Sequence, residues 1–124
     1  NTLQAQGKVL QFLKQSREAL ANYESALSIY REVGDRLGEA NTLQAQGFLA
    51  QRNNQFRAAL EFFQQALEIY QHIGDRYSEG MTLQAMSPVY QQLGQVKESF
   101  AAGMRANKLL QDVDMPLEAM PYPN

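Results

Sequence analysis

The sequence contains no cysteine, one histidine and only four prolines among its 124 residues. Without cysteine there is no thiol nucleophile, no disulfide framework and no cysteine-bound zinc, and a reducing cytoplasm fits this composition. No run of 18 apolar residues is present, which excludes a membrane-spanning helix. Eleven basic and thirteen acidic residues give a net charge of −2. That balance lacks the basic excess that binding to phosphate backbones requires, so we expect no nucleic-acid partner.

Catalytic and metal-binding residues are equally scarce. His72 has no second histidine, no cysteine and no cluster of carboxylates beside it to complete a metal site. The sequence also offers no set of serine, aspartate and histidine and no glycine-rich phosphate loop. It therefore predicts a protein that is not an enzyme and that holds no cofactor and no metal.

Glutamine is the residue in excess, with 16 copies, and much of it follows an internal repeat. Residues 1–7 read NTLQAQG, residues 41–47 read NTLQAQG again, and residues 81–87 read MTLQAMS. The related segments IYREVGDR and IYQHIGDR end the first and second units, again forty residues apart. A fixed period of this length predicts a stacked array of repeated structural units.

Each unit has the pattern of two helices. Leu60, Phe63 and Leu67 follow the spacing of an amphipathic helix. The pair Asn53-Asn54 is typical of a tight turn. Glycines 34 and 74 suit the left-handed position that ends a helix, and aspartates 35 and 75 suit the N-cap of the next one. The pattern predicts an all-α fold of three antiparallel helix pairs, with helices over about 2–14, 17–33, 36–53, 56–73, 76–93 and 96–111. The predicted units are 1–39, 40–79 and 80–111, followed by a proline-rich tail over 112–124.

Small residues predict where helices approach closely. A glycine inside a helix costs about 1 kcal/mol relative to alanine, so Gly7 and Gly47 indicate a partner helix too near for a side chain. The third unit departs from this pattern, because Ser87 replaces the glycine and Gly103 replaces the aromatic residue of unit two. Pro88 lies inside a predicted helix, where it removes one backbone hydrogen bond and predicts a kink.

The order leucine, glycine, alanine, aromatic, alanine at Leu43, Gly47, Ala59, Phe63 and Ala66 resembles the tetratricopeptide repeat. The resemblance covers about residues 1–111. The forty-residue period and the GDR joint are similar to the long-repeat subfamily of bacterial signalling proteins, kinesin light chains and spindle-orientation adaptors. The resemblance implies an α-solenoid, a right-handed superhelical stack whose first helices line a concave surface that binds proteins or peptides.

One stripe of each first helix is expected to face that surface. The glutamines of the stripe recur at the forty-residue period, while the residue between them changes from lysine to phenylalanine to proline. We expect the amides to bind the backbone of a mostly neutral, extended peptide and the variable residues to set its preference. Inheritance of the glutamines by repeat duplication is the alternative interpretation. The predicted contact residues are Gln4, Lys8, Gln11, Gln44, Phe48, Gln51, Arg52, Gln84, Pro88 and Gln91.

The two ends of the chain suggest a second hypothesis. The chain starts inside a predicted first helix, as expected of a piece cut from a longer protein. The residues from Met115 to Asn124 contain three of the four prolines and form either a linker or a segment that covers the end of a stack. An uncapped stack exposes apolar surface, so self-association through repeat ends or the tail competes with peptide binding as the function.

Overall fold

The computed structural model describes residues 2–112, and this part of the chain consists of helices joined by short turns. The helices are α1 (Thr2–Val33), α2 (Arg36–Arg52), α3 (Phe56–Ile73), α4 (Arg76–Gln92) and α5 (Val96–Asp112). The predicted all-α solenoid is confirmed, and the bounds of α2 to α5 lie within one residue of the predicted ones. The predicted tail from 113 onward lies outside the described residues.

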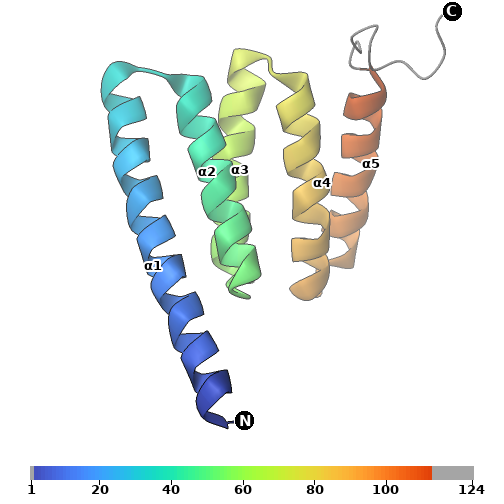
Figure 1. The fold of residues 1–124 in the computed structure, drawn as a ribbon. Coiled ribbons are helices and arrows are strands. Elements are labelled where there is room, and N and C mark those ends of the chain that lie inside the picture. Colours follow the sequence, from blue (N-terminus) through green and yellow to red (C-terminus); the bar gives the residue numbers. More distant parts are fainter. Residues whose placement is uncertain (1, 113–124) are drawn as a thin grey trace, which may run out of the picture.

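Each helix packs beside the next one along the chain and runs in the opposite direction (Figure 1), and a side-chain hydrogen bond also joins α2 to α4. Helices α2 and α3 form one pair, and α4 and α5 form another. Two clusters of buried side chains fill the space between the helices. One contains Leu43 and Ile69 from the first pair, and the other places Phe63 together with Leu83 and Met86 from the second. The core therefore runs continuously from one pair to the next.

The first predicted pair is replaced by one helix. We predicted a turn near residue 15 between two helices, but α1 is continuous over 32 residues. Its first part projects beyond the end of α2 (Figure 1). The physical reason lies at the forty-residue equivalents of the turn. Asn53 and Asn54 end α2, and Asn54 adopts a φ of 62°, whereas Leu13 and Lys14 occupy these places in α1 and are good helix formers.

The predicted close approach is confirmed at Gly47. A Cβ atom built on Gly47 would lie 2.6 Å from Cε1 of Phe63, whose ring is fully buried. At Gly7 the same prediction is wrong. Outside its own helix, no described atom comes within 4 Å of a Cβ atom built there, because the partner helix of a folded-back pair is missing.

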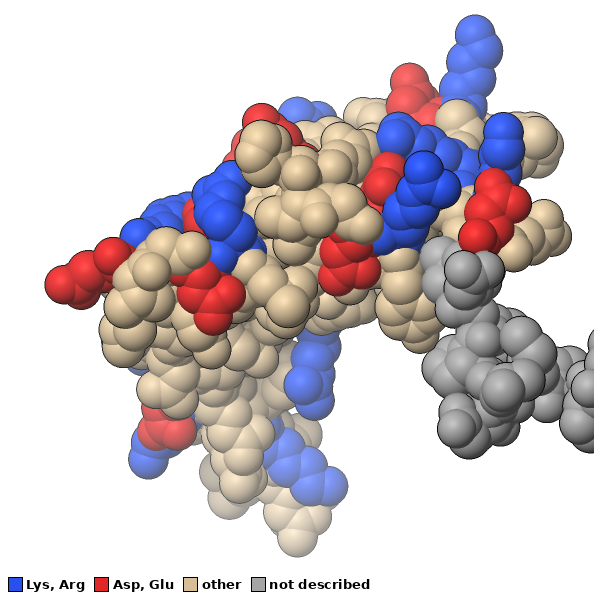
Figure 2. All heavy atoms as spheres, turned by 90° about the horizontal axis from the view of Figure 1, so that it is seen from above, with Lys and Arg blue, Asp and Glu red and all other residues tan. Residues whose placement is uncertain are grey.

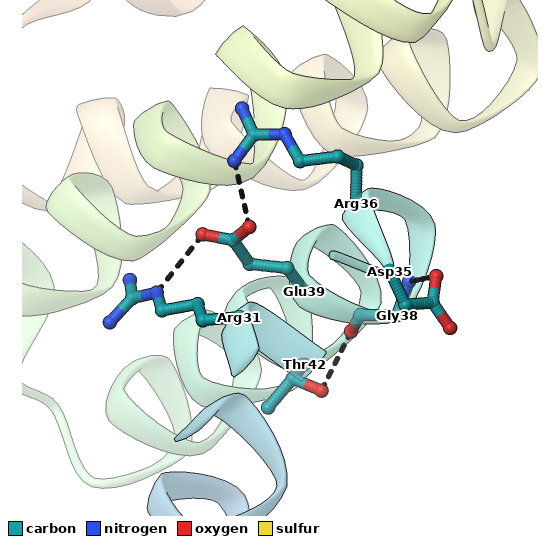
Figure 3. Close-up of polar contacts among 6 residues, drawn as sticks. All are labelled: Arg31, Asp35, Arg36, Gly38, Glu39 and Thr42. Carbon is teal, nitrogen blue, oxygen red and sulfur yellow. Dashed lines mark hydrogen bonds and ion pairs between the residues drawn. The ribbon is translucent and has the colours of Figure 1, made fainter. Parts of the chain in front are cut away.

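The joints between helix pairs are built as predicted. Gly34 has a φ of 76°, which closes α1, and Asp35 then caps α2 by accepting a hydrogen bond from the amide of Gly38 at 2.8 Å (Figure 3). Gly74 and Asp75 repeat this arrangement between α3 and α4, with φ 77° and an accepted bond of 3.1 Å. The repeated GD dipeptide therefore sets both turns.

A buried glutamate holds each joint together. The carboxylate of Glu39 accepts from Arg36 at 2.7 Å and from Nε of Arg31 at 3.0 Å (Figure 3). The corresponding Glu79 accepts from Arg105 on α5 at 3.0 Å and from Gln71 on α3. From the sequence alone, Glu39 and Glu79 pair on the surface with the arginine three residues before each. The expected pair with Arg36 forms at Glu39, whereas Glu79 pairs with Arg105, and both glutamates are buried between helices.

Candidate functional surface

The predicted contact residues form one triple on each first helix. The α2 triple is Gln44, Phe48 and Gln51, the α4 triple is Gln84, Pro88 and Gln91, and the α1 triple is Gln4, Lys8 and Gln11. Gln44 on α2 is half-buried and its Nε2 donates to Oγ1 of Thr82 on α4 at 3.1 Å. This bond ties the two helices together, although Gln44 and Thr82 are 38 residues apart. Gln51 is half-buried one turn nearer the end of α2 than Phe48. The first amide of this triple therefore has a structural role of its own.

Phe48 is the apolar member of the α2 triple. Its side chain is 48% exposed, and its ring meets the buried ring of Phe63 edge to face, with 5.1 Å between centroids. Aromatic pairs of this geometry are worth about 0.5–1.5 kcal/mol beyond the area that they bury. The contact with Phe63 fixes one edge of Phe48 against the core and leaves the other edge available to a partner.

The α4 triple is open to solvent. Gln84, Pro88 and Gln91 are all exposed, and α4 runs from Arg76 to Gln92 without a break at the proline. Proline has no amide hydrogen, so the carbonyl of Gln84 receives no helical bond from residue 88. The kink predicted at Pro88 remains a prediction. This part of the surface thus combines two exposed amide side chains with an exposed proline.

The first triple lies elsewhere. Gln4, Lys8 and Gln11 are exposed on α1, and the first part of this helix projects past α2 (Figure 1). The guanidinium carbon of Arg52, the last residue of α2, lies 5.7 Å from the ring centroid of Phe12, which marks where α2 ends beside α1. The structure therefore brings α2 and α4, the helices that carry two of the triples, together through the bond from Gln44 to Thr82, while the first triple lies on α1.

The third unit contains a hollow that the second lacks. Gly103 takes the place of Phe63, and a Cβ atom built there would meet only Oγ of Ser87, at 3.7 Å. The hydroxyl of Ser87 in turn lies 3.0 Å from the carbonyl and from the hydroxyl of Ser99. The missing ring leaves an open depression between α4 and α5, lined by Ser87, Gln91, Phe100, Gly103 and Met104 among others. Gln91 thus borders a depression that its position in the stripe did not indicate.

Charges of both signs are mixed over the end of the molecule where the joints lie (Figure 2). Acidic and basic side chains alternate there without a broad patch of one sign. Burial, together with the nearby charge of Asp75, raises the pKa of Tyr70 to about 12. Its hydroxyl donates to Asn41 Oδ1 at 2.6 Å, so this tyrosine is a structural member of the α2/α3 pair.

Comparison with known families decides the identity of the repeat. A family model described as tetratricopeptide repeat matches residues 1–72, more than half of the chain. The chain belongs to the tetratricopeptide repeat family. This family generally mediates protein–protein interaction and is a non-catalytic repeat module. No curated protein and no solved structure matches the chain. Assignment to the long-repeat subfamily stays a prediction.

The tetratricopeptide match ends before the third unit, in which Ser87 and Gly103 depart from the repeat pattern. Among residues 2–112, no group of three or more histidines, aspartates and glutamates is placed to hold a metal ion. None of the helices described is long and apolar enough to cross a bilayer.

Sequence reasoning missed one feature of this surface and anticipated another, since a buried amide at Gln46 is expected to bond across units or to meet water. The bond from Gln44 to Thr82 was not foreseen, although a threonine at both 42 and 82 is a visible part of the repeat. The buried oxygen Oε1 of Gln46 has no hydrogen-bond partner among the described residues. Gln46 lines a cavity between α1 and α2 together with Asn53, so an ordered water molecule is the expected partner there.

Proposed function

We propose that the surface formed by the exposed residues of α2 and α4 binds an extended segment of a protein partner. The observation that carries this proposal is Phe48, an aromatic side chain that is half exposed and fixed against the core by Phe63. Rigid aromatic side chains bury a large area on binding at a low entropic cost, and for this reason they dominate the energetics of interfaces.

The surroundings of Phe48 suit a peptide backbone. Gln51, Gln84 and Gln91 each offer an NH2 donor group and a carbonyl acceptor. The backbone carbonyl of Gln84 also lacks a helical bond from residue 88, which is proline. Arg52 is the single charged residue among the predicted contacts on α2 and α4. We therefore propose a mostly neutral ligand, with an affinity that depends little on salt concentration. A cytoplasmic location and a partner other than nucleic acid stay predictions from composition.

A peptide library displayed on phage and selected against the 124-residue chain tests the proposal. Selected peptides are then measured against Phe48→Ala and against Ile73→Ala. Ile73 is an exposed apolar residue at the end of α3, outside the proposed surface, and serves as a matched control. We expect Phe48→Ala to weaken binding at least tenfold and Ile73→Ala to leave it within twofold.

Because Phe48→Ala also removes a contact with Phe63, a second variant keeps the test independent of stability. Gln51→Ala combined with Gln91→Ala removes two amides that make no hydrogen bond to the described part of the fold, and both changes favour the helix. We expect an unchanged melting temperature and a weaker peptide complex. Peptides that bind both variants as tightly as the original chain would show that the ligand sits elsewhere.

A further inference from the structure

The same peptide sequence occurs twice in this chain, in two opposite environments. Residues 42–47 pack inside the α2/α3 pair, where Leu43 is 1% exposed and Gly47 faces the ring of Phe63. Residues 2–7 have identical letters, yet Leu3 is 78% exposed and Gly7 faces no described side chain. A glycine inside a helix costs about 1 kcal/mol unless close packing makes use of it. The first copy therefore has the shape of a docking helix without its partner.

The matching partner surface is also present and is only partly covered, since Ala19, Tyr23 and Ala26 are half-buried. Residues 17–33 of α1 repeat the side of α3 that receives α2, with Ala19, Tyr23 and Ala26 at the places of Ala59, Phe63 and Ala66. The exposed fraction differs at the next apolar position of the repeat, since Ile69 is 5% exposed and its equivalent Ile29 is 58% exposed. Helix α1 thus contains both halves of the interface that α2 and α3 form with each other.

A continuous helix cannot bring its own two halves together. Gly7 and Tyr23 are separated by about 24 Å along the axis of α1, at a rise of about 1.5 Å per residue. They also point in directions that differ by about 160° around the axis, at about 100° per residue. The donor surface around Gly7 and the acceptor surface around Tyr23 consequently lie far apart and on nearly opposite sides of one helix.

We propose that residues 2–14 of one copy of this chain pack on residues 17–33 of a second copy, as α2 packs on α3. The proposal goes beyond peptide binding, because it assigns a different surface and a different partner. The opposite placement of donor and acceptor decides how the assembly grows. A second copy that covers the Gly7 side of α1 lies away from the Tyr23 side. Two copies therefore cannot each dock residues 2–14 on residues 17–33 of the other. The contact is head to tail and open-ended.

Disulfide trapping tests the contact directly, since the chain has no native cysteine. A chain with Gly7→Cys is mixed with a chain with Tyr23→Cys under oxidising conditions, and each variant is also oxidised alone. We expect a covalent pair in the mixture only. The double variant should give a ladder of multimers on a non-reducing gel. A double variant that closes within one chain, or a mixture without covalent pairs, would overturn the proposal.

Tyr23 is partly buried, so Tyr23→Cys could disturb the fold for reasons unrelated to the contact. A second cysteine pair at exposed positions controls for this. Leu3→Cys mixed with Ile29→Cys uses two exposed positions whose equivalents, Leu43 and Ile69, share one buried cluster. The same covalent pair is expected from this mixture. The spacing of thiols that a disulfide accepts is narrow, with Cα atoms about 4.4–6.8 Å apart, so random collisions give little product.

Sedimentation over a concentration series tests how the assembly grows. The average mass of the original chain should rise with concentration and pass the mass of a dimer. Gly7→Leu should remain a monomer, since its side chain would occupy the place of the incoming Tyr23 ring. Gln6→Leu places a leucine about 100° away from both the Gly7 side and the Tyr23 side of the helix and should assemble like the original chain. A monomer at every concentration, a mass that stops at two chains, or equal behaviour of the two variants would contradict the proposal.

A turn graft provides the converse test. Leu13→Asn combined with Lys14→Asn places in α1 the residues that end α2. The grafted chain should fold back on itself, remain a monomer and form its disulfide between positions 7 and 23 within one chain. Continued growth of the assembly after the graft would show that the continuous α1 is not its cause.

Discussion

The two glycines of the repeated segment allow one substitution to be compared in two environments. Gly47→Leu introduces a side chain whose Cβ atom would lie 2.6 Å from Cε1 and 2.7 Å from Cδ1 of Phe63. Phe63 has no room to retreat, because its ring is fully buried and rests against Phe48. Gly7→Leu makes the same change within the same seven-residue sequence, where no described atom outside the helix lies within 4 Å.

The expected magnitudes follow from two contributions. Replacing glycine by leucine inside a helix favours the helix by about 0.5–1 kcal/mol, and this gain applies at both positions. Overpacking a filled core costs about 1–3 kcal/mol and sometimes more, and this cost applies only at Gly47. The helix contribution cancels when the two variants are compared, so the difference in unfolding free energy between them should be about 1–3 kcal/mol. Gly7→Leu should be the more stable chain, and more stable than the original.

Thermal unfolding followed by circular dichroism measures this difference. The measurement is made at a concentration at which all chains sediment as monomers. For a chain of this length each kcal/mol shifts the melting temperature by about 3–6 °C. Amide exchange locates the effect, because unfolding of repeat stacks can be local, and faster exchange is expected in α2 and α3 of Gly47→Leu. Equal melting temperatures for the two variants would refute the assignment of Gly47 as the point of closest approach.

A rescue variant isolates the contact with the ring. Combining Gly47→Leu with Phe63→Ala removes the atoms that the new side chain would strike. The double variant should be less destabilised than the sum of the two single changes, with a coupling of about 0.5–3 kcal/mol. Additive effects would mean that the cost at Gly47 arises from some other neighbour.

Three further changes probe the helix pairs. Glu79→Gln removes a buried charge that accepts from Arg105, and we expect a loss of about 1–3 kcal/mol in chemical denaturation. Tyr70→Phe removes the bond to Asn41 and should cost about 0.5–1.5 kcal/mol. The unfolded chain ionises Tyr70 at the ordinary pKa near 10, whereas the folded chain does so at about 12. The original chain should therefore lose stability between pH 10 and pH 12 in an alkaline unfolding series, and Tyr70→Phe should lack this decline. Gly103→Ala fills open space in a helix and should raise the melting temperature by the equivalent of about 0.5–1 kcal/mol.

Local signals in the sequence determined most of the helical framework. Gly34 and Gly74 adopt the left-handed conformation that few other residues tolerate, and Asp35 and Asp75 cap the helices that follow. Each of these signals acts within four residues of its effect. They could therefore be interpreted without knowledge of the tertiary structure, and they placed α2 to α5 within one residue of the observed bounds.

Features that depend on distant packing were not predictable in the same way. Glu39 and Glu79 are each expected to pair on the surface with the arginine three residues earlier. Glu39 does pair with Arg36, but both glutamates are buried, and Glu79 is paired instead with Arg105, which is 26 residues away. Gln44 is a predicted peptide contact and also donates a structural hydrogen bond to Thr82. Neither partner can be chosen from spacing along one helix, because the choice depends on which helices become neighbours.

The turn near residue 15 shows how an absence in the sequence outweighs a strong repeat. The repetition of residues 1–7 at 41–47 predicts two identical helix pairs, but only the second pair has residues that stop its first helix. Asn54 tolerates a positive φ, and Lys14 at the equivalent place favours continued helix. A repeat in tertiary structure thus requires the turn residues to be repeated as well as the packing residues. In α1 only the packing residues recur. Its two matching surfaces therefore cannot pack on each other, and each needs a partner surface from another helix.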